Sequence, residues 1–532
     1  MHLEPHLAPR PANHPPLTPV EFLIKTTEVH GHKAGVAWGE ETWSYRAFAR
    51  MVGRFARFLQ ANGIRQGDVV SIMAANRPEM LAAHFAVPML GAVLNTINTR
   101  LDAGTVAYVL RHCESRLLLT DRTCRLVALE AASNEVRCRV LSRRQGEEIE
   151  DDTIDLLADD GVDADFDLAA IADEWQPLCI NYTSGTTGRP KGVVYTHRGA
   201  YLNALGNVLA LGLTAQSTYL WTLPMFHCNG WSHTWAVTAA GGLHVCLDRP
   251  DPALIIPALE MHHVTHLACA PVVLYMMLDH PMLKMRNASN RIKVATGGAA
   301  PTEALIEKLC SLGFDLIHLY GLTESYGPAT LRNLTDEERA GPPGEVARAL
   351  ARQGVPHATA SRARVVDQAG NEIASDGTTL GEIVLAGNTL MAGYYHDADA
   401  TTQAFKDGVF HTGDLAVRHE DGNIEIRDRS KDIIISGGEN ISSLEVESVL
   451  HRHPAVLLAA VVAMPHEKWG ETPVAFIELR ENMTAHDAEL RAFCHQHLAG
   501  YKVPSRIFFA DLPKTATGKI QKFVLRDRVR NI

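Results

Sequence analysis

Residues 182–192 read Y-T-S-G-T-T-G-R-P-K-G, and this stretch says more about the fold than any other part of the chain. An apolar run predicts a buried strand before it, and Thr196 can cap a helix that follows it. Gly185 and Gly188 let the backbone turn tightly, while hydroxyl side chains and Lys191 can surround an anion. The spacing differs from the G-x-x-x-x-G-K-S/T loop, and the chain contains no G-x-G-x-x-G stretch. A plain surface loop is the alternative, but eleven ordered positions favour a loop that binds a polyphosphate.

Short apolar runs recur on both sides of this loop, and helical segments separate them. From Asp68 the chain reads strand, helix, strand, with Pro78 suited to the first turn of the helix. Upstream, Ser44 can cap a helix that Asn62 and Gly63 would end. This spacing predicts an α/β fold with parallel sheets flanked by helices. The later runs are residues 178–182, 219–223, 243–247, 266–270, 292–295 and 316–320.

The length of 532 residues exceeds what one compact core usually holds, so at least two domains are expected. The sequence changes character near Asp428, and the last hundred residues predict their own strands and helices. Ser442 and Glu445 match a capping box, residues 456–463 and 474–479 predict strands, and a helix is expected over 487–499. We therefore expect a loose N-terminal arm over 1–18, a large domain over 19–428 and a small α+β domain over 429–532.

Composition narrows the class of protein. Hydrophobic residues make up 46% of the chain and charged residues 21%, as in ordinary globular proteins. The formal net charge of -11 argues against a general nucleic-acid binder. The nine cysteines are scattered without a C-x-x-C pair, the N-terminus lacks a signal peptide, and no apolar stretch is long enough to span a membrane. The last residues, V-R-N-I, are not the S-K-L peroxisomal signal, so a cytoplasmic location is expected.

Further motifs follow the loop in a fixed order. They are G-G-A-A-P at 297–301, Y-G-L-T-E at 320–324, F-H-T-G-D-L at 410–415, D-R-S-K-D at 428–432 and P-K-T-A-T-G-K at 513–519. Together they resemble the adenylate-forming superfamily of acyl-CoA synthetases, nonribosomal adenylation domains and beetle luciferases. The resemblance covers nearly the whole chain after the arm. It implies a large N-terminal domain of flanked β-sheets and a smaller, mobile α+β C-terminal domain.

The resemblance also implies roles in nucleotide binding. Tyr320 would pack on adenine, Thr323 would contact phosphate and Glu324 would help to hold magnesium, since a hard dication prefers oxygen ligands. Asp414 would accept both ribose hydroxyls, and Lys519 would reach the carboxylate and the α-phosphate during adenylation. The complete set implied for ATP or AMP is Thr183, Ser184, Gly185, Thr186, Thr187, Gly188, Lys191, Gly298, Ala299, Ala300, Tyr320, Gly321, Thr323, Asp414, Ile426, Arg429 and Lys519.

Two segments of the last domain point to coenzyme A. In similar ligases, paired glycines matching Gly437 and Gly438 line the pantetheine tunnel, and a tryptophan matching Trp469 meets the nucleotide end. A purely structural tryptophan is the alternative for Trp469. Lys431 matches the hinge at which the small domain changes orientation between the two half-reactions.

The stretch P-M-F-H-C-N-G-W, residues 224–231, matches the segment that flanks the carboxylate site in the family. The resemblance makes His227 a catalytic or gating residue, and the expected pocket walls are Trp231, Trp235, Gly298 and Gly321. Bulky tryptophans would leave room for a short, medium-chain or aryl acid rather than a long fatty chain. We reject a nucleophile or zinc site at His227 and Cys228, because adenylation needs no covalent intermediate and no ligand set of zinc spacing accompanies them.

A second histidine group, His262, His263 and His266, resembles a metal site, but a surface helix or loop is the expected interpretation.

The expected protein is thus an ATP-dependent, AMP-forming acyl-CoA ligase that uses Mg²⁺ and coenzyme A and acts on a small carboxylic acid. A homodimer is kept as an option. The alternatives are an adenylation enzyme that loads a carrier protein, a luciferase-like oxygenase and a catalytically inactive nucleotide-binding homologue. Intact Lys191, Glu324, Asp414 and Lys519 argue against the last of these.

Overall fold

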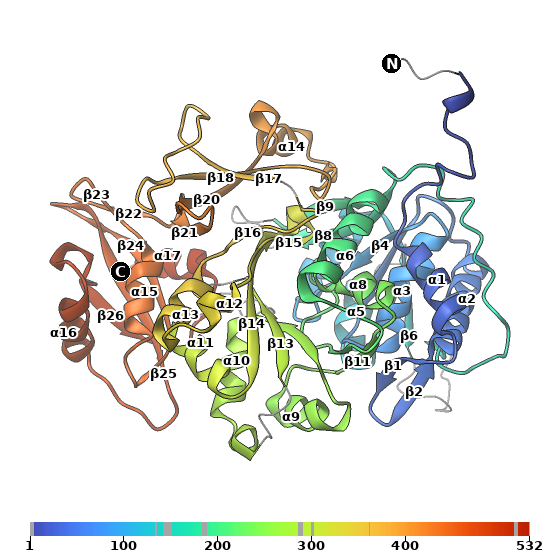
Figure 1. Cartoon of the computed structure of the whole chain (residues 1–532), viewed down its shortest axis with the longest axis horizontal. Helices are drawn as coiled ribbons and strands as arrows, with labels where there is room; N and C mark the ends of the chain where they lie inside the picture. The colour runs from blue at the N-terminus through green and yellow to red at the C-terminus, as the bar shows by residue number, and fades with distance from the viewer. Residues whose placement is uncertain are drawn as a thin grey trace.

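The computed structural model describes residues 5–132, 136–141, 152–183, 189–285, 291–298, 303–360, 362–514 and 520–530. Its described part contains two large β-sheets and two smaller ones, with helices packed between and around them (Figure 1). The α/β fold predicted from the sequence is confirmed. The first described residues, from Pro5, project from the body, and the first α-helix begins at Val20.

A nine-stranded sheet contains most of the apolar runs downstream of the phosphate loop. Five of these runs form neighbouring parallel strands, β10 to β14, because strands covered on both faces need continuous apolar sequence. In sheet order the strands are β16 (Val355–Pro356), β15 (Gly327–Arg332), β14 (Phe314–Leu322), β13 (Ile292–Thr296), β12 (His266–Cys269), β10 (Thr218–Leu220), β11 (Leu243–Cys246), β1 (Ala34–Trp38) and β2 (Glu41–Ser44).

An eight-stranded sheet holds the phosphate stretch. Strands β8 and β9 pair antiparallel, and Thr183 lies opposite Lys191 in their register. The stretch therefore joins two strands, and the helix capped by Thr196 starts only after β9, which the sequence analysis did not predict. In sheet order the strands are β19 (Gly393–Tyr394), β9 (Lys191–Thr196), β8 (Pro177–Thr183), β4 (Val93–Thr96), β3 (Val69–Met73), β5 (Ser115–Thr120), β6 (Arg137–Leu141) and β7 (Thr153–Ile154).

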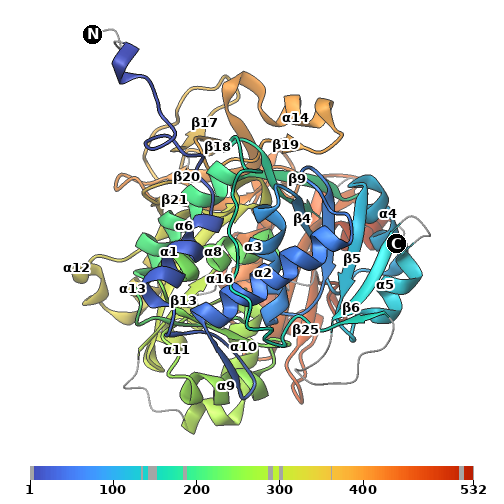
Figure 2. The same cartoon turned by 90° about the vertical axis from the view of Figure 1, so that its right-hand side faces the viewer.

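The two large sheets share one hydrophobic core, which includes residues of both sheets and of the helices between them. Figures 1 and 2 show α3, α6 and α8 in this central layer. The expected caps form: Ser44 accepts a hydrogen bond from the Ala47 amide, and Thr196 accepts one from the Gly199 amide. Helices of the first half are α1 (Val20–His30), α2 (Tyr45–Ala61), α3 (Pro78–Met89), α4 (Ala103–His112), α5 (Arg125–Ala131), α6 (His197–Leu211), α7 (Cys228–Trp231), α8 (His233–Ala239) and α9 (Pro252–Met261).

The four-stranded sheet leads into the last part of the chain. Its strands are β17 (Arg362–Val366), β18 (Gly381–Ala386), β20 (Phe410–Arg418) and β21 (Ile424–Arg429). The boundary that we predict at 428/429 lies at the end of β21. The second half also contains α10 (Pro271–Asp279), α11 (Glu303–Ser311), η3 (Thr323–Ser325), α12 (Asp336–Arg339), α13 (Pro343–Ala351) and α14 (Ala398–Ala404).

The C-terminal part has its own five-stranded sheet and its own hydrophobic clusters. It comprises β22 (Ile434–Ser436), β23 (Glu439–Ile441), α15 (Ser443–Leu450), β24 (Val456–His466), β25 (Gly470–Leu479), α16 (Asp487–His497), β26 (Arg506–Phe509) and α17 (Lys522–Arg530).

Two local expectations for this part need correction. The helix expected to reach residue 499 ends at His497, where Leu498 is already extended. Ser442 caps α15, but the Glu445 side chain does not complete a capping box and binds the Lys502 ammonium at 2.7 Å instead.

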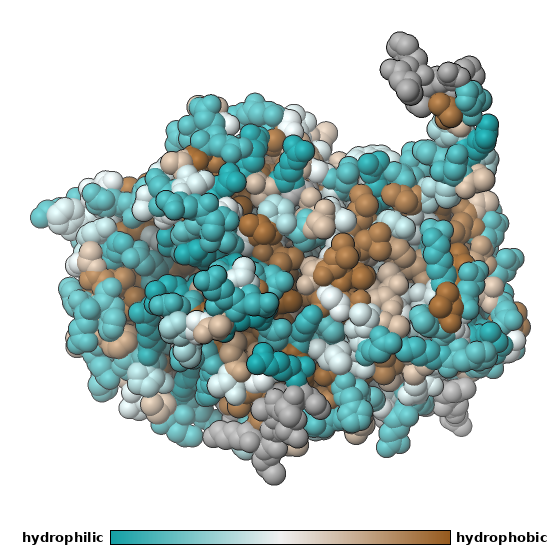
Figure 3. Space-filling model, viewed as in Figure 1, coloured by the Kyte–Doolittle hydropathy of each residue, from teal (hydrophilic) through white to brown (hydrophobic). Residues whose placement is uncertain are grey.

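Hydrophilic residues cover most of the face shown in Figure 3, and hydrophobic residues gather near its centre. Within the described ranges, no helix combines the length and apolar character that crossing a membrane requires.

Candidate active site

Three predicted nucleotide-binding side chains meet at the end of β14 and the start of the β20–β21 pair. The Tyr320 hydroxyl donates a hydrogen bond to Asp414 Oδ2 at 2.8 Å, and Arg429 Nε lies 3.1 Å from Asp414 Oδ1. Asp414 and Arg429 face each other because they are register partners in adjacent strands. Asp414 is only 3% exposed. Tyr320 precedes Asp414 by 94 positions in the sequence, and the fold brings it beside the β20–β21 pair.

Burial, followed by the negative charge of Asp414, raises the pKa of Tyr320 well above its ordinary value. Tyr320 therefore stays protonated and serves as a hydrogen-bond donor. Burial is the largest single effect on Arg429 and would lower its pKa, but the nearby groups Asp414, Tyr320, Asp432 and Glu324 together outweigh burial and raise it. A carboxylate has about four lone-pair positions, so Asp414 keeps acceptor capacity for further hydroxyl groups. The neighbouring Ile426 is half-buried in β21, and its amide donates to Gln353 Oε1 at 2.6 Å.

Thr323 and Glu324 lie in the short helix η3 directly after β14. The backbone fixes this turn, because Tyr195 donates to the Thr323 carbonyl at 2.6 Å and the Met391 amide donates to the Glu324 carbonyl at 2.8 Å. The Glu324 carboxylate accepts a hydrogen bond from the Tyr394 hydroxyl at 2.8 Å. Among the described residues, no cluster of three or more His, Cys, Asp or Glu side chains could hold a metal ion by itself. A single carboxylate still fits Mg²⁺, which usually keeps several waters and binds substrate phosphates.

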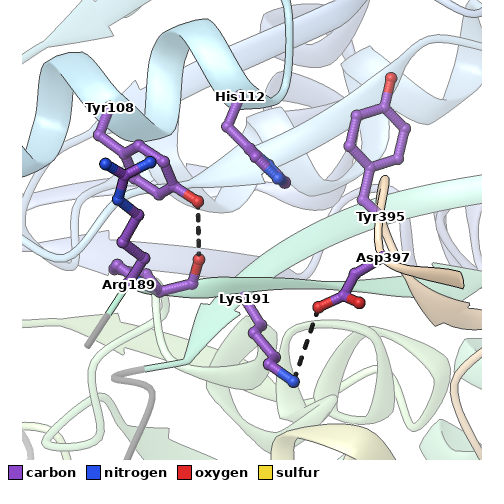
Figure 4. Close-up of a pocket in the computed structure, with 7 residues that line it drawn as sticks. Tyr108, His112, Arg189, Lys191, Tyr395 and Asp397 are labelled. Carbon is purple, nitrogen blue, oxygen red and sulfur yellow. Dashed lines mark hydrogen bonds and ion pairs between the residues drawn. The ribbon is translucent and has the colours of Figure 1, made fainter. Parts of the chain in front are cut away.

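The Lys191 side chain lies between the Tyr394 ring and the Asp397 carboxylate. Its ammonium lies 4.8 Å from the centre of the Tyr394 ring and 3.6 Å from Asp397. It borders a cavity of about 420 Å³ that Figure 4 shows between helix α4 and the residues after β19. Tyr108, His112, Arg189, Pro190, Lys191, Tyr395 and Asp397 line this cavity.

Arg189, Pro190 and Lys191 belong to the glycine-rich motif, but the sequence analysis did not find the other four lining residues, which belong to no motif and meet it only through the fold. The predicted phosphate-binding residues Ser184, Gly185, Thr186, Thr187 and Gly188 lie outside the described residues, and so does Lys519.

The two glycines of the predicted acyl pocket differ in how much space surrounds their Cα atoms. Gly298 has φ +81°, and a Cβ added to it would meet no atom of the described residues within 4 Å, so these residues leave its backbone accessible to a ligand. A Cβ on Gly321 would lie 1.7 Å from the Gly327 carbonyl oxygen, so Gly321 is required by strand packing. The predicted contacts Ala299 and Ala300 lie outside the described residues.

His227 borders a small cavity of about 50 Å³, together with Thr96, Asn98, Tyr182 and Phe226. Phe226 and Tyr182 belong to motifs identified in the sequence, but Thr96 at the end of β4 and Asn98 just after it were not identified. The Cys228 thiol lies 3.8 Å from His227 Nε2 and donates to the Thr323 hydroxyl at 3.5 Å. Burial raises the pKa of Cys228 to about 11. A thiol that stays protonated is a poor nucleophile, which agrees with our rejection of covalent catalysis.

The two predicted tryptophan walls occupy different places. Trp231 is 6% exposed, and a Cβ on Gly297 would lie 3.3 Å from its ring. Trp231 therefore packs beside Gly297, the first residue of the small-residue segment. Trp235 is fully buried and donates to the His84 carbonyl at 3.1 Å, so it belongs to the core between α8 and α3.

The predicted coenzyme A residues lie on the edge of the C-terminal sheet. Gly437 and Gly438 have φ +62° and +89°, and the Gly437 amide donates to the Trp469 carbonyl at 2.8 Å. Trp469 is 47% exposed, and the Lys468 ammonium lies 4.4 Å from its ring centre. An exposed aromatic ring beside a cation offers a stacking face and a positive charge. The predicted hinge residue Lys431 is exposed between β21 and β22.

The second histidine group is not a surface cluster. His266 is 7% exposed in strand β12, where Nε2 contacts the Leu211 carbonyl at 3.1 Å, whereas His262 and His263 follow α9. The expectation of a surface helix or loop is therefore wrong for His266, because the apolar run after it is a central strand.

Comparisons with known proteins agree with this geometry. The family described as AMP-binding enzyme matches residues 24–395, and the AMP-binding enzyme C-terminal domain matches residues 445–519. A 2-methylpropanoate–CoA ligase from Humulus lupulus is 42% identical over 99% of this chain and 97% of its own. A peroxisomal benzoate–CoA ligase from Arabidopsis thaliana is 39% identical over 98% of this chain and 94% of its own.

Solved structures lead to the same fold. The o-succinylbenzoate CoA synthetase from Bacillus subtilis, in complex with its acyl-adenylate intermediate, superposes with a TM-score of 0.79 at 28% identity. The match covers 96% of this chain and 98% of that structure. The chain therefore belongs to the AMP-binding enzyme family, and to the adenylate-forming CoA ligases within it, as its motifs predict.

Proposed function

We propose that the protein converts a small carboxylic acid, ATP and coenzyme A into acyl-CoA, AMP and pyrophosphate. In the first step a carboxylate oxygen attacks the α-phosphorus, and pyrophosphate leaves. In the second step the sulfur of coenzyme A attacks the acyl carbon, and AMP leaves. The observation that carries this proposal is the cluster of Tyr320 and Arg429 around the buried Asp414 carboxylate, an acceptor for ribose hydroxyls. Glu324 and Lys191 lie on the elements that follow and flank it.

Two lysines and Glu324 would act on the phosphates of ATP through their charges. Lys191 would neutralise phosphate oxygens, while Lys519 would oppose the charge that develops at the reacting phosphorus. Magnesium would supply further charge neutralisation on the phosphates, and Glu324 would hold it. Removing divalent cations with a chelator should therefore abolish adenylation, and added Mg²⁺ should restore it.

A short, medium-chain or aryl acid is the substrate that we propose. Trp231 supports this choice, because its buried ring takes up volume beside Gly297. The relatives are named for 2-methylpropanoate and benzoate, which are both small acids. Their names also favour coenzyme A over a carrier protein as acceptor.

One assay tests the reaction and the acid together. AMP release is measured with ATP, Mg²⁺ and a panel of acids, with coenzyme A or a phosphopantetheinyl carrier protein as acceptor. We expect turnover with C4 to C10 or benzoate-like acids and coenzyme A. Faster turnover of palmitate would refute the acid class, and absence of labelled pyrophosphate exchange into ATP with every acid would refute the reaction.

Replacing Lys431 with proline should impair the second half-reaction selectively. Proline fixes φ near -65°, so it would restrict the backbone rotation that a hinge needs. We expect formation of acyl-CoA from supplied acyl-AMP to fall at least about tenfold, while pyrophosphate exchange changes little. Lys431→Ala is the matched control, since it removes the same side chain but leaves φ free. Equal rates for the two variants would argue against a hinge at this position.

We also propose that the enzyme works in the reducing cytoplasm. All nine cysteines are free, and burial raises the pKa of several of them, for instance Cys494 to about 11. Fractionation of cells that produce the protein at native levels, with detection of the untagged chain, would test this location.

A further inference from the structure

A buried chain of polar groups joins strand β21 to the C-terminal helices. Asp428, which is 2% exposed, accepts a hydrogen bond from the Ser443 amide at 2.5 Å. The Ser443 hydroxyl in turn accepts a hydrogen bond from the Lys522 ammonium at 2.6 Å. The same ammonium lies 2.7 Å from Glu447, whose carboxylate also accepts from the Val461 amide. Lys522 thus connects β21, α15 and β24 with α17.

The strand end at which this chain starts also forms the ribose-binding cluster. Asp428 and Arg429 are consecutive residues of β21, and side chains alternate between the two faces of a strand. Arg429 contacts Asp414 on one side, while Asp428 contacts Ser443 on the other. A displacement of Asp428 would therefore also move Arg429, the neighbouring residue that contacts Asp414.

The other end of the chain leads toward Lys519. Lys522 is the first residue of α17 and follows Lys519 by three positions, which span at most about 10 Å of extended chain. Lys514 and Ile520, which flank the stretch 515–519, form an antiparallel bridge. The described residues on the two sides of this stretch are therefore paired with each other, and the Lys522 ammonium anchors the start of α17.

We propose that Lys522 is a positioning residue for adenylation: by binding Ser443 and Glu447 it fixes the start of α17, three residues after Lys519, relative to the ribose-binding end of β21. The inference rests on the proposed function, because it assigns Lys522 to the half-reaction that needs Lys519. Lys522 itself touches no substrate. It acts through the position of its neighbours.

The electrostatics of the junction support this role. Burial disfavours the ammonium form, but the carboxylates of Glu447, Asp428 and Asp432 outweigh burial and raise the pKa of Lys522. A second cation on the same helix, Arg526, pairs with Asp432 directly after the predicted hinge. A buried network of this kind loses its geometry when one member is removed, because the remaining charges are left without partners.

The test compares the two half-reactions in full-length variants. For Lys522→Met we expect kcat of pyrophosphate exchange to fall at least about tenfold, with KM for ATP changed by less than about threefold. Formation of acyl-CoA from supplied acyl-AMP should change by less than about threefold. Lys522→Arg keeps the charge and should recover most of the lost exchange rate.

Lys502→Met is the matched control. Lys502 also binds a carboxylate of α15, Glu445 at 2.7 Å, but this pair does not include β21 or α17. The control should leave both half-reactions near the wild-type rates. If Lys522→Met proves too unstable to assay, Ser443→Ala removes only the bridging hydroxyl and should show a smaller loss confined to pyrophosphate exchange.

The outcomes separate the inference from the proposed function. Equal losses in both half-reactions for Lys522→Met, or the same loss for Lys502→Met, would overturn the positioning role. A wild-type enzyme without pyrophosphate exchange would instead overturn the proposed function. Double substitution with Asp428→Asn adds a check, because members of one network should give effects that are not additive.

Discussion

Lys519→Ala is expected to lower the rate of acyl-adenylate formation by about two to three decades, as is typical when a group that stabilises transition-state charge is lost. The reaction brings a carboxylate onto a phosphate, so two negatively charged groups approach while charge develops at phosphorus. A cation at this point stabilises the transition state more than it stabilises bound ATP. The loss should therefore appear in kcat, with KM for ATP little changed.

Single-turnover measurements of each half-reaction check this expectation. Acyl-CoA formation from supplied acyl-AMP should stay within about threefold of the wild-type rate, because that step has no attack on phosphorus. Arg530→Ala is a suitable control, since Arg530 is another cation near the C-terminus, is 70% exposed and pairs with Asp527 at 3.5 Å on its own helix. An equal loss in both half-reactions would contradict the role of Lys519 in adenylation.

The order of the motifs was sufficient to predict the family, and the apolar runs were sufficient to predict the parallel strands. Both predictions work for a physical reason: a strand covered on both faces must be apolar along its length, and β12, β13 and β14 are. Strand β9 was missed because its six residues follow the glycine-rich loop closely. The sequence analysis therefore treated them as the connection to helix α6 rather than as a strand.

Contacts between distant segments could not be predicted in the same way. The hydrogen bond from Tyr394 to Glu324 joins residues 70 positions apart, and Tyr394 belongs to no motif. His112 enters the cavity beside Lys191 only because helix α4 packs there. The family resemblance placed Trp235 in the acyl pocket together with Trp231, but α7 and α8 are separated by Ser232 in a left-handed conformation. The turn redirects the chain, and Trp235 faces α3 instead.

Asp414→Asn should raise KM for ATP by about 100-fold or more while kcat falls much less. The side chain would contact the ribose in both the ground state and the transition state, so its loss weakens both equally. Hydrogen bonds to a charged group are worth about 1.5–3 kcal/mol each, and two ribose hydroxyls would lose their acceptor. The asparagine keeps the size of the side chain but replaces one acceptor oxygen with a donor that faces either Tyr320 or Arg429.

The same substitution should cost stability only modestly. Arg429 loses its partner, but its side chain is 31% exposed and can be solvated, so we expect a loss of about 1–2 kcal/mol in the free energy of unfolding. Asp421→Asn is the control. Asp421 also pairs with an arginine, Arg352 at 3.4 Å, but its side chain is 48% exposed on the loop after β20. Steady-state kinetics with varied ATP test the change in KM, and denaturant unfolding tests the change in stability. A large fall in kcat with KM unchanged would mean that Asp414 acts in the chemical step and that the ribose is held elsewhere.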